Sequence, residues 1–410
     1  MKSIVIFGLG RSSKWLVYEL AKRSTHAKIS AYDVVIPQWL GDIPNIDFYQ
    51  IESIDDVKLL PAGSLVISLL PPSEHLKVAH LALMCDCNFI TASYLNPEID
   101  SLGHHYQQKG LYSIHEAGLD PGIDHITALH AIDTLHEEGY TITHFESHCG
   151  GLPALSNLNR WGYTFFWSPL NVLNAGKAGA KYLKDSQEIN LDYEQVFKSS
   201  KPINLLGIGE FEFYPNRDSF AYIKPYGLPE VKTFIRGTMR YAGFGQFWQS
   251  LIDCGLTSEE LLPTGSKTYE DLLSSLPNTT KKVKALFEGW HQKSLGDTQT
   301  YSEALFALLL SKLSPAPSDL DRVVMYHNIV GVKEGSRTCY QFTMDIEGTP
   351  QFSSMSQTVG LPLKLICDLF IEGVKLKSGC YTVADPQLRS LLHPMLINSG
   401  LPMHESLDYV

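Results

Sequence analysis

The chain opens with Ser3-Ile-Val-Ile-Phe-Gly-Leu-Gly-Arg-Ser-Ser13, an apolar run that is stopped by a glycine-rich turn. Gly8 permits a tight turn, and Gly10 lets backbone amides approach a pyrophosphate. Ser13 stands where the dinucleotide fingerprint has its third glycine, and it is small enough for close packing of helix on strand. The helix that we expect from near Ser12 would offer free N–H groups and its positive dipole end to phosphates. The segment therefore predicts a dinucleotide-binding βα turn.

Asp33 ends the next expected strand, which runs from Lys28 to Asp33. A carboxylate at this point accepts hydrogen bonds from the adenosine ribose and repels a 2′-phosphate, so it favours NAD over NADP. Arg11 lies inside the glycine turn and can contact a phosphate, so both cofactors stay open. The residues alone also allow a tight βα turn in an α/β protein that binds another ligand.

Strands and helices alternate through the first third of the chain. The apolar run Leu65-Val-Ile-Ser-Leu-Leu70 has the pattern of a strand that is buried on both faces. The alternation indicates parallel βαβ units and a Rossmann-type, doubly wound parallel sheet in an α/β protein. The expected strands are 3–7, 28–33, 65–70, 88–92 and 110–115, and the expected helices are 12–22 and 74–84.

After about residue 138 the pattern changes. Strand-like runs at 140–149, 233–239, 322–330 and 338–345 predict a second sheet, and 244 to about 320 reads as helices, one of them at Ser258 to Leu262. An apolar helix from about Met355 to Glu372 is a candidate to return to the first domain with the segment 355–410. We therefore expect three parts, which are a dinucleotide-binding domain at 1–120, an α+β substrate domain at 121–243 and 322–354, and a helical insert at 244–321.

Composition narrows the class of protein. With 44% hydrophobic and 19% charged residues over 410 positions, the chain is a packed globular protein of more than one domain. Its net charge of -11, without a block of Lys and Arg, makes nucleic acid and anionic membranes poor partners. The longest apolar run, Ala304 to Leu310, is far too short to cross a membrane.

The seven cysteines are odd in number and scattered, which argues against a secreted disulfide framework. No second pair follows Cys85 and Cys87 at zinc spacing, so we expect no metal. Arg11 and Lys14 interrupt any signal-peptide core. These features predict a soluble, cytoplasmic protein.

The stretch His115-Glu-Ala-Gly-Leu-Asp-Pro-Gly-Ile-Asp-His125 follows the last strand of the first sheet. Open α/β sheets place their ligands at the carboxyl ends of their strands. The simplest interpretation is structural, with Asp120 as a helix N-cap and Pro121 as the first helical residue. A helix start beside a nicotinamide would also suit a carboxylate or a developing negative charge.

Two further groups of residues point to a substrate. The two glycines in His148-Cys-Gly-Gly-Leu-Pro153 indicate a close backbone approach to a ligand or a neighbouring chain. Arg217, Arg236 and Arg240 lie among aromatic residues, and arginine forks suit carboxylates. Taken singly, these arginines fit surface or interdomain salt bridges equally well. We interpret His115, His125 and His148 as structural.

Several segments resemble the signature segments of saccharopine dehydrogenase of the glutamate-forming type (saccharopine reductase). Their order and rough spacing match from the first strand to about residue 245, and the helical block and C-terminal tail match in pattern alone. The resemblance implies a nucleotide domain, a sheet domain for substrate binding and dimerisation, a helical insert and a homodimer. The segments are Glu116-Ala-Gly-Leu-Asp-Pro-Gly-Ile-Asp-His125, His148-Cys-Gly-Gly-Leu-Pro153, Gly162-Tyr-Thr-Phe-Phe-Trp-Ser168, Tyr214-Pro-Asn-Arg-Asp218 and Arg236-Gly-Thr-Met-Arg-Tyr-Ala-Gly-Phe244.

The resemblance implies NAD(P)-dependent oxidation of saccharopine to L-glutamate and 2-aminoadipate 6-semialdehyde, or the reverse condensation, in lysine metabolism. Family members that use NADP tend to have a basic or small polar residue near Asp33, so this carboxylate departs from their pattern. By resemblance, Asp120 and Tyr94 are the candidate general bases, with Cys149 as a polar neighbour. The implied cofactor contacts are Gly8, Leu9, Gly10, Arg11, Ser12, Asp33, Ser93, Leu119 and Pro121, and the implied substrate contacts are Ser93, Tyr94, Asp120, Arg217, Thr238, Met239 and Arg240.

Two other functions remain as alternatives. A lysine 6-dehydrogenase or a carboxynorspermidine dehydrogenase would apply the same hydride chemistry to another amine. Three arginines favour a tricarboxylate, whereas a polyamine would require acidic residues around it. A redox sensor that binds NAD(P) without turnover is the alternative from another class, and it would not need the arginines.

Overall fold

The structure, a computed structural model, describes residues 2–23 and 26–409, so residues 1, 24, 25 and 410 of the predicted segments lie outside the described residues. Its contacts define two compact units, Met1–Thr134 with Gln351–Met403 and Leu135–Pro350 with His404–Val410. Within the described residues, none of the helices combines the length and the apolarity that a membrane crossing demands.

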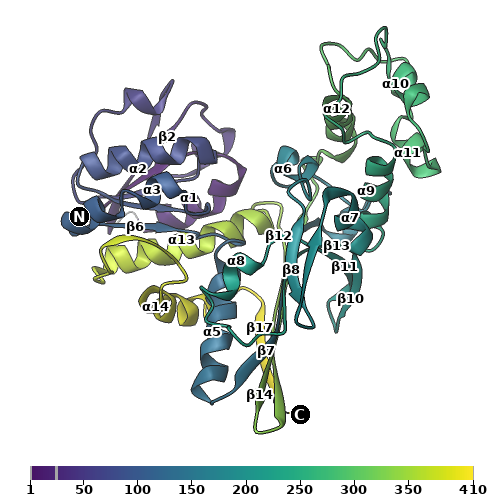
Figure 1. Ribbon diagram of the computed structural model, residues 1–410. Helices are drawn as coiled ribbons and strands as arrows, with labels where there is room; N and C mark the ends of the chain where they lie inside the picture. Colours follow the sequence, from purple (N-terminus) through teal and green to yellow (C-terminus); the bar gives the residue numbers. More distant parts are fainter. Residues whose placement is uncertain (1, 24–25, 410) are drawn as a thin grey trace. The chain divides into compact units, whose positions relative to one another are not determined.

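The first unit is built on a seven-stranded parallel sheet in the order β16-β6-β5-β4-β1-β2-β3. Figure 1 shows helices beside the strands of this unit. The strand order changes direction between β1 and β4, the switch point at which a doubly wound sheet binds its ligand. This confirms the predicted Rossmann-type sheet. Its strands are β1 (Lys2–Phe7), β2 (Ala27–Asp33), β3 (Ile46–Gln50), β4 (Leu65–Ser68), β5 (Asn88–Thr91), β6 (Tyr112–His115) and β16 (Gly379–Thr382).

Seven helices accompany these strands in the described part of the chain, and α5 continues across the boundary into the second unit. All four residues of β4 are buried, as the apolar run predicts. The helices are α1 (Lys14–Ala21), α2 (His75–Met84), α3 (Pro97–Asp100), α4 (Gly103–Gln108), α5 (Ile123–Glu137), α13 (Ser354–Glu372) and α14 (Pro386–Ile397).

The C-terminal helix α13 holds the start of α1 in place. The Ser356 hydroxyl accepts a hydrogen bond from the Trp15 amide at 3.0 Å and donates one to the Ser12 carbonyl at 3.3 Å. Gly360 faces the Trp15 ring so closely that a Cβ would lie 2.9 Å from its Cε3 atom. Residues more than 340 positions apart thus fix the helix that follows the glycine turn.

The second unit holds a mixed ten-stranded sheet with the main path β10-β11-β13-β7-β14-β15-β17. The four strand-like runs of the sequence correspond to β13, β7, β14 and β15, which are neighbours in this path. The strands are β7 (Thr141–Pro153), β8 (Ala180–Lys184), β9 (Gln187–Leu191), β10 (Lys201–Leu205), β11 (Gly209–Pro215), β12 (Arg217–Asp218), β13 (Thr233–Tyr241), β14 (Asp321–Lys333), β15 (Ser336–Glu347) and β17 (Met403–Tyr409).

The predicted helical insert shares a hydrophobic core with residues 161–197 of the second unit, so the threefold division of the sequence stays a prediction. The expected helix at 258–262 is wrong, because Leu261 pairs with Thr300 in an isolated β-bridge. Pro263 follows directly and disfavours helical backbone at the residue before it. The helices of this unit are α6 (Pro169–Leu173), α7 (Tyr193–Val196), α8 (Phe220–Ile223), α9 (Phe244–Asp253), α10 (Tyr269–Ser275), α11 (Lys281–Leu286) and α12 (Tyr301–Leu313).

Candidate functional site

Gly8 occupies the predicted turn after β1, at a backbone φ of +99°. A Cβ at this position would lie 2.8 Å from the Leu69 carbonyl carbon and 2.9 Å from the Leu70 nitrogen, both in the chain that leaves β4. Gly10 is exposed, and a Cβ there would meet nothing within 4 Å. The first glycine therefore serves the close approach of two strand ends, and the second leaves an open backbone face.

The helix after the turn begins later than the sequence predicts. Residues Arg11–Ser13 form one 3₁₀ turn, and α1 begins at Lys14 rather than near Ser12. Ser13 is fully buried, and its hydroxyl donates a hydrogen bond to the Gly10 carbonyl at 2.8 Å. The small side chain thus closes the turn, while Arg11 stays exposed.

Asp33 contacts the glycine turn directly. Its carboxylate accepts a hydrogen bond from the Leu9 amide at 2.5 Å and another from the Val35 amide at 3.1 Å. Two features that the sequence suggested separately therefore meet at the end of β1 and β2. The negative charge is held where the ribose end of a dinucleotide would lie.

Ser93 and Tyr94 follow β5, beside the segment that follows β6. The Glu116 amide donates a hydrogen bond to the Ser93 carbonyl, and the Ala117 amide donates one to the Thr91 carbonyl, each at 3.0 Å. Ser93 is half-buried and Tyr94 is 40% exposed. The backbone therefore brings these two predicted site residues next to the 116–125 segment.

The predicted N-cap at Asp120 is wrong. Asp120 and Pro121 form a turn with a cis peptide bond between them, and α5 begins at Ile123. The Gly118 amide donates to the Pro121 carbonyl at 3.0 Å, so the chain folds back on itself before the helix begins. Asp120 is exposed at the tip of this turn, whereas Leu119 and Pro121 are buried.

Acidic side chains and a histidine lie around the base of the turn. The Asp124 carboxylate accepts a hydrogen bond from the Gly122 amide at 2.6 Å. The buried His125 ring has its Nε2 atom 3.3 Å from a carboxylate oxygen of Glu116, whose backbone has a positive φ of 60°. Sequence reasoning assigned no role to Glu116, although a non-glycine residue with this φ is uncommon. These contacts fit the structural role predicted for His125.

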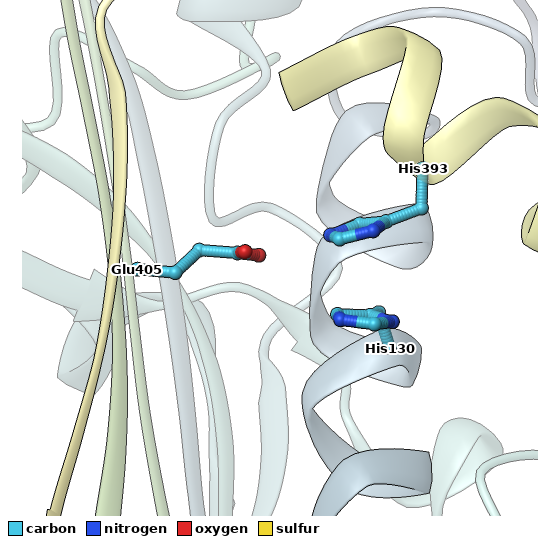
Figure 2. Close-up of side chains that lie close together, drawn as sticks. All are labelled: His130, His393 and Glu405. Atoms are coloured by element: carbon cyan, nitrogen blue, oxygen red, sulfur yellow. The ribbon is translucent and has the colours of Figure 1, made fainter. Parts of the chain in front are cut away.

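Helix α14 is fastened to α5 through two pairs of side chains in the first unit. Figure 2 shows the His130 ring of α5 stacked on the His393 ring of α14, and the ring centroids are 3.5 Å apart at an interplanar angle of 20°. Arg389 of α14 also forms an ion pair with Asp133 of α5. The stacked rings and the ion pair therefore attach α14 to α5, the helix that starts after the Asp120 turn.

Cys149 and Thr238 are neighbours in the second unit, paired in register on β7 and β13. A Cβ on Gly150 would lie 2.5 Å from the Met239 carbonyl oxygen, so Gly150 marks a close backbone approach, but not the predicted one to a ligand or a neighbouring chain. That approach is to β13 of the same chain. It brings two predicted site residues together.

Arg240 is 1% exposed and lies among aromatic rings. Its guanidinium carbon is 4.8 Å from the ring centre of Tyr163, 5.2 Å from Phe244 and 5.8 Å from Tyr214. The Nη1 group donates to the Met239 carbonyl at 2.9 Å, while Nε has no hydrogen-bond partner among the described residues. Nor does any carboxylate of the described chain form an ion pair with Arg240. A buried cation with unused donors is costly unless an anion binds it.

The other predicted substrate residues have different surroundings. Met239 is fully buried in an apolar cluster with Leu152 and Phe211, so its side chain contributes to packing. Arg236 stacks over the Tyr222 ring at 4.2 Å. Arg217 is exposed, in the short strand β12, with a positive φ of 53°. Arg217 is therefore available to a ligand.

His75 was missed by sequence reasoning. Its ring joins the Ser68 and Ser93 hydroxyls at 2.8 Å and 2.7 Å. Burial lowers the pKa of His75 to about 4, so the ring is neutral near pH 7. No motif surrounds this histidine, and its partners lie 7 and 18 residues away on other elements.

Comparisons with known proteins agree with the predicted resemblance. Residues 118–398 match the family described as saccharopine dehydrogenase C-terminal domain. The chain is 28% identical to NADP(+), L-glutamate-forming saccharopine dehydrogenase of Schizosaccharomyces pombe over 99% of both chains. It is 30% identical to the protein of the same name from Pyricularia oryzae, over 84% of this chain and 81% of that one.

The fold agrees as well. The structure of apo histidine-tagged saccharopine dehydrogenase (L-Glu forming) from Saccharomyces cerevisiae superposes with a TM-score of 0.89, at 24% identity and over 100% of both chains. The match of the family over more than half of the residues and the relative at 30% identity decide the classification. The chain belongs to the saccharopine dehydrogenase family.

Proposed function

We propose that the protein catalyses the NAD(P)-dependent oxidation of saccharopine to L-glutamate and 2-aminoadipate 6-semialdehyde, or the reverse reductive condensation. The family membership and the names of its relatives support this proposal. The observation that carries it is Arg240, a buried guanidinium without a carboxylate partner among the described residues. Saccharopine joins the ε-nitrogen of lysine to the α-carbon of a glutamate unit, and it has three carboxylates that such a cation can bind.

The residues at the switch point fit a nicotinamide dinucleotide. Gly8 holds the strand ends together, Gly10 leaves an open backbone face, and Asp33 is fixed beside them. We propose that Leu9 to Ser12 contact the pyrophosphate and that Leu119 to Pro121 lie against the nicotinamide end. When bound, the nicotinamide supplies the hydride acceptor for oxidation of the amine.

The chain itself must supply proton transfer and carboxylate binding. A base must take the ammonium proton of saccharopine so that hydride can leave the lysine-derived ε-carbon, and it must later activate the water that attacks the imine. We propose Asp120 or Tyr94 for this role, since both are exposed near the end of β5 and β6. Arg217, Thr238 and Arg240 would bind carboxylates, with Cys149 as a polar neighbour of Thr238.

Cofactor choice is the first quantitative prediction. We expect kcat/KM for NAD to exceed that for NADP, because the Asp33 carboxylate repels a 2′-phosphate. Asp33→Asn keeps an oxygen acceptor for the Leu9 amide but removes the charge, so the NAD/NADP ratio should fall about tenfold. Steady-state kinetics with both cofactors measure the ratio. A wild-type preference for NADP, as in the names of the relatives, would refute the prediction.

Arg217 gives the second prediction. Arg217→Ala should raise KM for saccharopine at least about tenfold, which is the loss expected from one charged pair. Arg217→Lys is the matched control, because it has the same backbone strain at positive φ and keeps a cation. KM in the lysine variant should lie between those of wild type and alanine variant. An unchanged KM in Arg217→Ala would remove this residue from the site.

The absorbance of reduced nicotinamide tests the whole proposal in a single assay. Wild-type protein with saccharopine and NAD or NADP should form the reduced cofactor. Turnover of lysine or a carboxylated polyamine, but not of saccharopine, would favour a related amine dehydrogenase. Cofactor binding without turnover of any of these amines would favour a redox sensor.

Two finer points belong to the same proposal. We propose a homodimer, as the family resemblance implies, and light scattering after gel filtration measures the mass.

We also propose a cytoplasmic location, which the seven free cysteines support because thiols persist in a reducing compartment.

A further inference from the structure

A short hydrogen-bond chain connects the end of β4, the start of α2 and the segment that follows β5 inside the first unit. The Ser68 hydroxyl, at the end of β4, lies 2.8 Å from Nδ1 of His75, and Nε2 of His75 lies 2.7 Å from the Ser93 hydroxyl. His75 is the first residue of α2 and is 3% exposed. The ring therefore connects the carboxyl end of β4 to Ser93, one of the predicted ligand residues.

The two hydroxyls at the ends of this chain are themselves held in place. The Thr91 hydroxyl donates to the Ser68 carbonyl at 2.8 Å and accepts from the Ser93 amide at 3.3 Å. The Ser93 carbonyl also accepts from the Glu116 amide. The distance between Ser68 and Ser93 is thus fixed by backbone and side-chain contacts, which leaves little freedom to the ring between them.

The surroundings of Ser68 determine which nitrogen of His75 carries the proton. Burial lowers the pKa of His75 to about 4, so the ring is neutral, with one donor and one acceptor nitrogen. Ser68 is fully buried, and within the described chain its hydroxyl has His75 as its sole hydrogen-bond partner. A buried hydroxyl proton needs an acceptor, so Ser68 donates to Nδ1. The proton of the ring is then on Nε2, and it is donated to Ser93.

We propose that His75 is a positioning residue that makes the Ser93 hydroxyl a hydrogen-bond donor to the bound ligand. Because Ser93 accepts from the imidazole, its own proton remains available. Ser93 is half-buried, and its hydroxyl contacts no side chain other than His75 among the described residues. This inference rests on the proposed function, and it specifies the direction of the hydrogen bond between Ser93 and the ligand.

The ligand group opposite Ser93 must therefore be an acceptor oxygen. Two groups in the proposed reaction have such an oxygen, namely a substrate carboxylate and the carboxamide of the nicotinamide. The KM values separate them. Ser93→Ala raises KM for saccharopine in the first case and KM for the cofactor in the second.

A double-mutant cycle tests whether His75 acts through Ser93. His75→Asn keeps a polar group near Ser68 but is too short to reach Ser93. We expect Ser93→Ala and His75→Asn each to lower kcat/KM about tenfold, and the double variant to lose no more than about tenfold in total. His80→Asn is the matched control, since it is the same substitution on the exposed side of α2. A loss of about a hundredfold in the double variant, or wild-type kinetics in His75→Asn, would overturn the proposal.

Nitrogen NMR of ¹⁵N-histidine-labelled protein supplies a readout without substrate. The signal that disappears in His75→Asn should show a neutral ring with the proton on Nε2 at pH 7. A proton on Nδ1, or a charged ring, would overturn the inference even in a fully active enzyme. If the wild type does not oxidise saccharopine, the proposed function fails, while the NMR result still decides the role of His75.

Discussion

Arg240→Met is expected to lower kcat/KM for saccharopine by about a hundredfold and to raise the free energy of unfolding by about 1 kcal/mol. The loss in activity follows because a charged hydrogen-bond donor to a carboxylate contributes roughly 1.5–3 kcal/mol. The gain in stability follows because methionine fills the space between the Tyr163, Tyr214 and Phe244 rings without burying a charge. A variant that loses activity but gains stability indicates that Arg240 serves binding rather than folding. Steady-state kinetics and urea denaturation measure them.

Arg322→Met is the matched control in the same sheet. Arg322 is also buried, but its guanidinium pairs with the Asp345 carboxylate at 2.6 Å and 2.7 Å. Its removal leaves a carboxylate without its cation, so this variant should lose about 3 kcal/mol of unfolding free energy and keep its KM for saccharopine. If Arg240→Met instead loses stability and leaves KM unchanged, Arg240 has a structural role.

The parallel sheet could be predicted because its strands carry their own signal. Apolar runs such as 65–70 end at glycine or proline, and amphipathic helices separate them. Strands without that signal were missed. In β3, Ile46–Gln50, none of the residues is fully buried, and β9, Gln187–Leu191, is equally open. Edge strands of this kind are defined by their partners rather than by their own residues.

Parts of the candidate site could be proposed from sequence where each feature lies in one short segment. The glycine turn and Asp33 are two such features, and the structure adds the hydrogen bond between them. His75 could not be predicted, because its hydrogen bonds reach two serines on other parts of the chain, Ser68 at the end of β4 and Ser93 after β5. The N-cap prediction at Asp120 was wrong because the local sequence does not show the backbone contact that Pro121 makes with Gly118. Asp-Pro before an apolar helix reads as a cap, whereas here the chain folds back through Gly118 before α5 begins.

Gly8→Ala should lower the free energy of unfolding by about 3 kcal/mol or more and raise KM for the dinucleotide at least about tenfold. Two effects add here. A side chain at a φ of +99° is strained, and its Cβ would lie 2.8 Å from the backbone of Leu69, which cannot move without displacing β4. Shifting β4 away from β1 opens the switch point at which the pyrophosphate is expected to bind.

Gly63→Ala separates the two effects. Gly63 has a positive φ of 74°, but a Cβ there would meet nothing within 4 Å. Its replacement should therefore cost only the backbone strain, about 1 kcal/mol, and leave the KM for the cofactor unchanged. Chemical denaturation and cofactor titration of both variants make the comparison. Equal losses in the two would mean that the contact between Gly8 and Leu69 does not matter, and that the glycine is required for its φ alone.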